Sequence, residues 1–400
     1  MSYKATIRAC YLGTVCQAVI VNLTALLFTA LGEQFGLSYT QLGALVLINF
    51  ITQVAVALIF GSIVDKIGFR PFIVGAHIGA AVGFAIFALT PWMPMPAYAM
   101  LVLGTLVFGA AGGFFELLLS PILNAIPSDE KSSAMSIMHA FFCIGHVGVA
   151  LGTTLVLFVL GREAWPLVVF MWLLLPLLNA FFFARCPMAE AVPVATQSSA
   201  SAALRTPLFI LLVMMILFAG ASELTFSQWA SAFLEEAMGL PKVLGDIGGV
   251  GMFAAMMAVG RIGYGVLKRR GVSWLPSQSR LMLMGSGMAL ISYVIIATAD
   301  NPFLGLVACA LCGLGVSLLW PGTLSLSVEA FPKAGTWMFA IMAAAGNIGA
   351  SAGPSAFGVI ADHSGLRMAF MLMAVVPFVM IAIMMLYHRM RGSQNENGTI

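Results

Sequence analysis

The feature that most constrains this sequence is a succession of long apolar runs separated by short polar turns. A helix needs about 20 apolar residues to cross the hydrocarbon core of a bilayer, and these runs reach that length. Only 8% of the residues are charged, whereas a soluble domain carries about 25%. We therefore predict an integral membrane protein. Helices are favoured over an outer-membrane barrel, because the strands of a barrel would alternate apolar and polar residues.

The runs predict an all-α membrane protein with twelve transmembrane helices in two six-helix halves. The longest polar linker, 191–206, separates an N-terminal half, 1–190, from a C-terminal half, 207–400, that ends in a short polar tail. The predicted spans are 8–32, 41–63, 71–90, 98–125, 134–159, 165–185, 207–234, 244–267, 280–298, 303–328, 337–361 and 366–387.

Lysine and arginine predict the orientation, because cytoplasmic loops carry an excess of both. If the N-terminus is inside, only three of the 18 basic residues, Arg162, Lys242 and Arg367, fall on the outer side. We therefore expect a multi-pass protein of the cell (inner) membrane with both termini in the cytoplasm.

The two halves repeat one another in sequence. Gly36-Leu37-Ser38 matches Gly239-Leu240-Pro241 at an offset of 203 residues, and Pro121 matches Pro321 at an offset of 200. A glycine-rich run at 145–152 matches one at 346–353 at an offset of 201. Two repeats in the same orientation predict a pseudo-two-fold axis along the membrane normal, with a central cavity between the halves. We expect both glycine runs to be close-packing surfaces.

The turn between the second and third predicted spans reads Gly61-Ser62-Ile63-Val64-Asp65-Lys66-Ile67-Gly68-Phe69-Arg70. It resembles the loop signature of the major facilitator superfamily, and the stretch 260–271 resembles a weaker copy. The resemblance implies a transporter that works by alternating access and a gate at this loop, where a glycine permits close helix approach and an acid faces a helix N-terminus. An ordinary basic inner loop is the alternative. The implied gating residues are Gly61, Asp65, Lys66, Gly68, Arg70 and Arg261.

Parts of both halves, including Ser120 to Asn124 and Gly220 to Trp229, are similar to the fucose, galactose and glucose proton symporter branch of that superfamily. In that branch an acid on span four and a polar residue on span five serve the substrate and the proton. The resemblance assigns the first role to Glu116. Phe142 stands at the second position, with His139 one turn earlier, and span one offers Gln17 and Asn22 in place of an acid.

Two isolated carboxylates, Glu116 and Glu223, lie within apolar runs. A charge inside a bilayer is costly, so we expect each acid to be buried against a cavity or a partner. An acid that fills and empties as access alternates would suit a proton-coupled carrier. A purely structural acid between helices is the alternative for both.

Other polar or aromatic residues share these helices or their neighbours. Ser120 and Asn124 follow Glu116 on one helical face, and two tryptophans could stack on a sugar ring. Each residue also has a structural explanation, as a hydrogen-bonding or packing group between helices, and we expect His77 and His146 to be structural. The candidate contacts for solute or proton are Glu116, Glu223, His139, Asn124, Ser120, Gln17, Asn22, Gln228, Trp229, Trp320 and Asn347.

Together these patterns favour a proton symporter of a small polar, sugar-like solute. A proton-antiport exporter of amphipathic compounds and an uncoupled facilitator remain open. The sequence has no phosphate-binding loop for ATP, no metal-ligand spacing and no nucleophile motif, so we expect no enzyme activity, no cofactor and no metal. The basic residues lie at the inner membrane edge, which indicates lipid and not nucleic acid. We expect a monomer.

Overall fold

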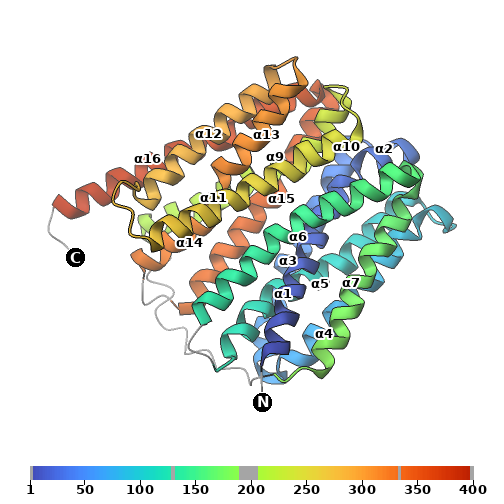
Figure 1. Cartoon of the computed structure of the whole chain (residues 1–400), viewed down its shortest axis with the longest axis horizontal. Helices are drawn as coiled ribbons and strands as arrows, with labels where there is room; N and C mark the ends of the chain where they lie inside the picture. Colours follow the sequence, from blue (N-terminus) through green and yellow to red (C-terminus); the bar gives the residue numbers. More distant parts are fainter. Residues whose placement is uncertain (1–2, 128–130, 189–205, 332–334, 397–400) are drawn as a thin grey trace. The chain divides into compact units, whose positions relative to one another are not determined.

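The computed structural model of the chain describes residues 3–127, 131–188, 206–331 and 335–396, and every regular element in these ranges is a helix (Figure 1). The chain divides into two compact units, unit 1 (Met1–Pro193) and unit 2 (Val194–Ile400). Buried side chains in both units are mostly apolar, as a helical protein with a packed interior requires.

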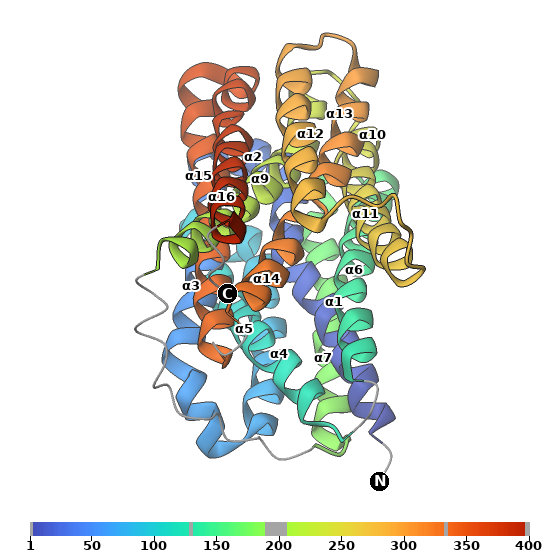
Figure 2. The same cartoon turned by 90° about the vertical axis from the view of Figure 1, so that its left-hand side faces the viewer.

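Unit 1 contains seven α-helices within its described residues. A capping box fixes the start of α3. The Ser38 hydroxyl oxygen accepts a hydrogen bond from the Gln41 backbone N–H, and the Gln41 side-chain oxygen accepts one from the Ser38 backbone N–H. Helix α1 packs against α6, and α4 packs against α5 and α7 (Figure 2). The helices are α1 (Lys4–Leu26), α2 (Phe28–Phe35), α3 (Tyr39–Ile67), α4 (Phe69–Ala88), α5 (Ala97–Ala125), α6 (Lys131–Leu160) and α7 (Trp165–Arg185).

Unit 2 begins with α9, whose N-terminus is capped by the Thr206 side chain and has Pro207 in its first turn. Helix α9 packs most extensively against α15, and α13 packs against α11 and α12. A π-helical segment, Asp246–Gly251, joins α10 to α11. The helices are α9 (Pro207–Glu236), α10 (Lys242–Gly245), α11 (Met252–Arg269), α12 (Gln278–Thr298), α13 (Pro302–Val316), α14 (Leu319–Ala330), α15 (Gly335–Met373) and α16 (Val375–Glu396).

Eleven helical stretches within the described residues are long and apolar enough to cross a bilayer. One of them, Ile341–Arg391, covers the last two predicted spans, and within it Gly365 has φ 80° and ψ 163° and is not helical. Its 51 residues have length for two crossings, since a span needs about 20. The other stretches overlap the remaining predicted spans, and the count of twelve stays a prediction.

Glycines with positive φ mark matching turns in the two units. Gly36 and Gly239 have φ of 63° and 69°, Gly68 and Gly271 have 94° and 62°, and Gly161 and Gly365 have 86° and 80°. Within each pair the residues are separated by 203, 203 and 204 positions respectively. The backbone therefore repeats the spacing that the sequence repeat predicts, at turns where sequence similarity alone is weak.

Replacing Gly68 by alanine is expected to destabilise the protein. Gly68 joins α3 to α4 with φ 94° and ψ 165°, a region that side-chain-bearing residues almost never adopt, at a cost of about 1–3 kcal/mol. The measurement is the thermal melting temperature of the purified protein in detergent. Gly75→Ala is the matched control, since a β-carbon at Gly75 meets no atom within 4 Å. Equal melting temperatures for the two variants would contradict the assigned strain.

Glycines on α15 allow unusually close packing against α9. A β-carbon on Gly349 would lie 1.8 Å from the Leu217 carbonyl oxygen, and one on Gly353 would lie 2.1 Å from the Thr225 hydroxyl oxygen. On the α9 side, a β-carbon on Gly220 would lie 2.4 Å from the Gly346 carbonyl oxygen. The prediction that this glycine run is a packing surface is confirmed.

Replacing Gly349 by alanine is expected to force α9 and α15 apart, because a backbone oxygen occupies the place of the added methyl group. Overpacking of this kind costs about 1–3 kcal/mol. We expect a lower melting temperature, whereas Gly148→Ala on α6, where a β-carbon meets nothing within 4 Å, should leave it unchanged. A Gly349→Ala variant as stable as the wild type would show that the contact relaxes without cost.

Candidate functional site

An ion pair joins two helices of unit 2 near the middle of α9. Arg261 Nη2, on α11, lies 3.5 Å from Glu223 Oε2, and Arg261 Nε donates a hydrogen bond of 3.0 Å to the Ser317 carbonyl oxygen. The Glu223 side chain is 11% exposed and the Arg261 side chain 24%. Sequence analysis assigned Glu223 to solute or proton binding and counted Arg261 as a gating residue at an inner span end. The structure makes each the counter-charge of the other.

Pro321 explains why the Ser317 carbonyl oxygen is available to Arg261. A proline lacks the amide hydrogen, and its ring clashes with the carbonyl four residues earlier, which here belongs to Ser317. The predicted span 303–328 is accordingly broken at this point, between α13 and α14. Gly260 allows α11 to approach the break, because a β-carbon there would lie 2.3 Å from Ser317 Oγ. Proline and glycine together position the arginine.

Replacing Pro321 by alanine is expected to slow the solute transport that the loop signature implies, without destabilising the fold. The new amide hydrogen can bond the Ser317 carbonyl and so competes with Arg261, whose hydrogen bond is worth about 1 kcal/mol or more. We expect the rate of solute uptake to fall about fivefold with a melting temperature at or above the wild-type value. Pro302→Ala, in the first turn of α13, is the control. Unchanged uptake would show that the break does not hold Arg261 in place.

Two serines follow Glu223 at helical spacing on α9. Ser227 is buried, and its hydroxyl has no hydrogen-bond partner within the part of the chain that the structure describes. Ser231 is also buried and donates to Asp246. The neighbouring candidate Gln228 is 1% exposed. The face of α9 that carries Glu223 is therefore polar within an apolar interior.

Trp229 does not fit the expected role of a platform for a sugar ring. Its side chain is 0% exposed, its indole nitrogen donates a hydrogen bond of 3.0 Å to the Pro354 carbonyl, and its ring stacks on Phe357 with centroids 4.9 Å apart. The physical reason is that Trp229 points toward α15, where it fills the helix contact. No face of the ring is accessible to a solute.

Trp320 retains accessible surface, in contrast to Trp229. It is partly exposed and lies over the close contact of α9 and α15, since a β-carbon on Gly346 would come 2.3 Å from its ring. Asn347, which follows Gly346 on α15, is 7% exposed. Both candidates therefore belong to the same crossing of helices in unit 2.

The prediction that Glu116 is buried is wrong, because its side chain is exposed. Helix α5 turns a different face inward, formed by Phe115, Leu118, Leu119 and Ile122, and Glu116 lies outside that stripe. Ser120, one turn later, is partly exposed. An exposed carboxylate in an apolar helix is stable only where water or a polar group reaches it.

A chain of side-chain amides links α1 to α3. Gln17 Nε2 donates to Gln53 Oε1 at 2.8 Å, and Gln53 Nε2 donates to Asn49 Oδ1 at 3.0 Å. Asn49 then donates to the Ile20 carbonyl at 2.9 Å. Gln53 and Asn49 were not among the predicted residues. Asn22 is 2% exposed and donates to a carbonyl of its own helix, which fits the structural explanation.

The structure describes the side-chain contacts of His77 but not those of His139. His77 has both ring nitrogens within hydrogen-bond distance of a partner, the Ile73 carbonyl at 2.7 Å and the Asn179 amide at 2.8 Å. It is 0% exposed, as the expected structural role requires. The side chains of the candidates His139 and Asn124 lie outside the described residues.

Arg70, the last residue of the loop motif 61–70, forms hydrogen bonds within unit 1. Arg70 donates hydrogen bonds of 2.6 Å and 2.8 Å to the carbonyls of Ala184 and Cys186 at the end of α7. A cation at a helix C-terminus is favoured by the helix dipole, so Arg70 fastens α7 to the start of α4. Gly68 provides the turn between α3 and α4. Three further gating candidates belong to α3, but the surroundings of their side-chain positions are not described: Gly61, Asp65 and Lys66.

A buried charged cluster in unit 2 was missed by sequence reasoning. Lys242 Nζ lies 3.2 Å from Asp246 Oδ1 and 3.7 Å from Glu235 Oε2, and the three side chains are 9%, 0% and 7% exposed. Charges at span ends are typical of the membrane interface, so no sequence pattern indicated that these three side chains are buried. The i, i+4 spacing of Lys242 and Asp246, next to a glycine-rich π-helix, was the available signal.

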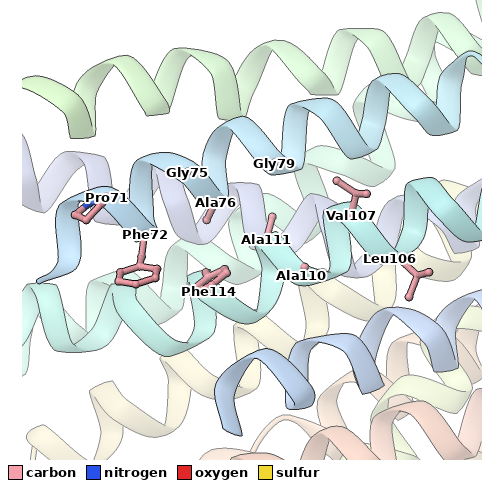
Figure 3. Close-up of a pocket in the computed structure, with 10 residues that line it drawn as sticks. All are labelled: Pro71, Phe72, Gly75, Ala76, Gly79, Leu106, Val107, Ala110, Ala111 and Phe114. Carbon is pink, nitrogen blue, oxygen red and sulfur yellow. The ribbon is translucent and has the colours of Figure 1, made fainter. Parts of the chain in front are cut away.

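A groove on unit 1 between α4 and α5 is unsuited to a polar solute. Its volume is about 440 Å³, and its lining includes Gly75, Gly79 and Ala110, with the rings of Phe72 and Phe114 at one end (Figure 3). Figure 3 labels no charged residue among those drawn. An apolar groove of this kind suits hydrocarbon and not sugar hydroxyls.

Comparison with known proteins identifies a matching family model and two similar proteins. A family model described as Major Facilitator Superfamily matches residues 10–336 and 277–399. An uncharacterized MFS-type transporter of Bacillus subtilis (strain 168), YttB, is 23% identical over 372 residues, which cover 91% of this chain and 90% of that protein. An uncharacterized MFS-type transporter of Yersinia pestis is 23% identical over 345 residues, or 84% of each chain.

Two solved structures share the fold. A bacterial homologue of the human lysosomal transporter Spinster, in an inward-facing and occupied conformation, superposes with a TM-score of 0.72 and 14% identity over 96% of each chain. The nucleoside transporter NupG gives a TM-score of 0.75 and 13% identity over 96% of this chain and 100% of that one. At this level of identity the likeness concerns the fold.

Proposed function

Because the chain belongs to the Major Facilitator Superfamily of multi-pass membrane transporters, we propose that it is a secondary transporter that couples a proton to the symport of a small polar, sugar-like solute. The observation that carries the proposal is the ion pair between Glu223 and Arg261. The pair is mostly buried but retains accessible surface on both side chains, so it can respond to water and solute.

Protonation of Glu223 is the coupling step in this proposal. Proton uptake removes the negative charge that lies 3.5 Å from Arg261 Nη2. The guanidinium has several N–H donors in a fixed fork, so it then binds oxygen atoms of the solute in place of Glu223. The Ser317 carbonyl keeps Arg261 oriented while its partner changes. Release of the solute and of the proton restores the ion pair.

The other candidates have supporting roles. Glu116 is a second candidate proton group, because an exposed carboxylate on an apolar helix needs water access. Ser227 offers a buried hydroxyl one turn from Glu223, and Trp320 offers a partly exposed ring that can pack on the apolar face of a sugar. Gln17 supplies an amide at the end of the hydrogen-bonded chain on α1 and α3.

Further parts of the proposal concern topology and partners. The distribution of basic residues supports cytoplasmic termini in the cell (inner) membrane. The matching positive-φ glycines support pseudo-symmetric halves, for which alternating access around a central cavity is the expected mode of transport. The partners are the solute, protons and the bilayer, with no nucleic acid, and the protein acts as a monomer.

A thermal-shift screen of the purified protein against sugars, nucleosides, organic acids and amphipathic drugs would identify the solute class. The stabilising compound is then used for uptake into proteoliposomes. We expect a sugar-like compound to stabilise the protein, and its accumulation to require an inward proton gradient. Counterflow without gradient-driven accumulation would instead show a facilitator. Gradient-driven movement of an amphipathic compound opposite to the proton would show an exporter.

A further inference from the structure

A second groove on unit 1 combines cationic and apolar walls. It has a volume of about 610 Å³ and lies where the first turns of α1 meet the last turns of α7, with Phe141 of α6 on one side. Both helices are candidate membrane spans, and their ends at this groove are the ends of those spans. The groove therefore lies at a membrane surface, where lipid headgroups are found.

Two arginines line the groove, Arg8 from α1 and Arg185 from α7, and both are exposed. Arg8 forms no hydrogen bond or ion pair with the residues that the structure describes. Arg185 lies over the Phe181 ring, with Cζ 3.7 Å from the ring centroid, and no acidic residue is among the residues that line the groove. Two positive charges thus face one space without an anionic partner from the lining.

The remaining walls are hydrophobic and held in place. Tyr11 stacks on Phe141 with centroids 4.9 Å apart, and Phe182 is 43% exposed. The Thr6 hydroxyl donates to the Pro187 carbonyl, which fastens the start of α1 to the segment after α7. The groove is therefore a preformed feature of unit 1 whose lining combines two arginines with apolar side chains.

We propose that this groove binds an anionic phospholipid, with the headgroup phosphate between Arg8 and Arg185 and an acyl chain along Tyr11 and Phe141. Guanidinium groups recognise phosphate by paired hydrogen bonds, and basic pockets between membrane helices suit acidic headgroups. The apolar side favours a lipid over a water-soluble phosphate, because a soluble phosphate leaves the exposed aromatic rings uncovered. The site is distinct from the Glu223 site, which lies in unit 2.

Native mass spectrometry of the full-length, delipidated protein tests the proposal, with titration of phosphatidylglycerol or phosphatidylcholine in detergent micelles. We expect preferential retention of phosphatidylglycerol. In the variant R8Q/R185Q we expect its apparent affinity to fall about 30-fold, since each arginine contributes about fivefold. The control variant R270Q/R280Q removes two exposed cations of unit 2. Its apparent affinity for phosphatidylglycerol should fall by less than about twofold. An unchanged melting temperature in phosphatidylcholine nanodiscs would show that the variants are folded.

Three results would overturn the proposal. The first is equal retention of phosphatidylglycerol by R8Q/R185Q and the wild type, and the second is an equal loss in the control variant. The third is displacement of bound lipid by millimolar glycerol phosphate, which would show that the groove recognises a soluble phosphate. Failure of any transport assay leaves these readouts unaffected, because none of them depends on the solute.

Discussion

Replacing Glu223 by glutamine is expected to abolish accumulation of the solute against its gradient while leaving counterflow intact. Glutamine keeps the size and hydrogen-bonding capacity of the side chain but neither releases a proton nor carries the charge that faces Arg261. A carrier without its proton group still alternates with solute bound, so exchange continues. The measurement compares concentrative uptake and counterflow of the same compound in proteoliposomes with an imposed proton gradient.

The matched control for this experiment is Glu163→Gln. Glu163 is an exposed residue of the short turn before α7, outside the candidate site, and its replacement should leave both assays unchanged. Glu116→Gln tests the second candidate carboxylate in the same way. Full proton-driven accumulation by the Glu223→Gln variant would rule out Glu223 as the coupling group, and its loss in Glu116→Gln alone would transfer the role to unit 1.

Replacing Arg261 by glutamine is expected to destabilise the protein by about 3 kcal/mol or more, the cost of removing one partner of a buried ion pair. The change leaves the Glu223 carboxylate without its counter-charge and the Ser317 carbonyl without its donor. The melting temperature of the purified protein should therefore fall more than in Glu223→Gln.

The double variant E223Q/R261Q separates the ion pair from a general packing effect. Removing both charges leaves no unpaired carboxylate, so we expect the double variant to be more stable than Arg261→Gln alone. Replacement of a buried pair by neutral groups is often close to neutral for stability. If the loss of stability in the double variant equals the sum of the losses in the two single variants, the two side chains do not interact. That result would contradict the geometry.

The helical fold and the span positions could be predicted because they depend on the length of apolar runs, which the sequence displays directly. The turns at Gly36 and Gly239 were also visible, since a repeated glycine marks a backbone conformation that other residues avoid. The non-helical Gly365 lies between the predicted spans 337–361 and 366–387, as expected of a turn. The break after α13 was not predicted, because a proline does not by itself show that a helix is interrupted: Pro121 and Pro354 lie inside helices of this chain.

The candidate site was predicted only in part. An isolated acid such as Glu223 is conspicuous in an apolar run, but its partner Arg261 lies 38 residues away on another helix. Sequence spacing says nothing about which faces of two helices meet. The same limit explains Trp229 and Glu116, whose exposure depends on the direction in which α9 and α5 face. Asp246 escaped notice because a charge near a span end is usually at the surface, whereas here it is 0% exposed.

The most direct test of the central claim is proton movement during transport. Proteoliposomes that enclose a pH-sensitive dye receive the identified solute on the outside, without an imposed proton gradient. The account predicts that wild-type protein acidifies the interior as the solute enters, and that Glu223→Gln carries the solute in exchange without any change of internal pH. Net entry of the solute into wild-type vesicles at constant internal pH would contradict it.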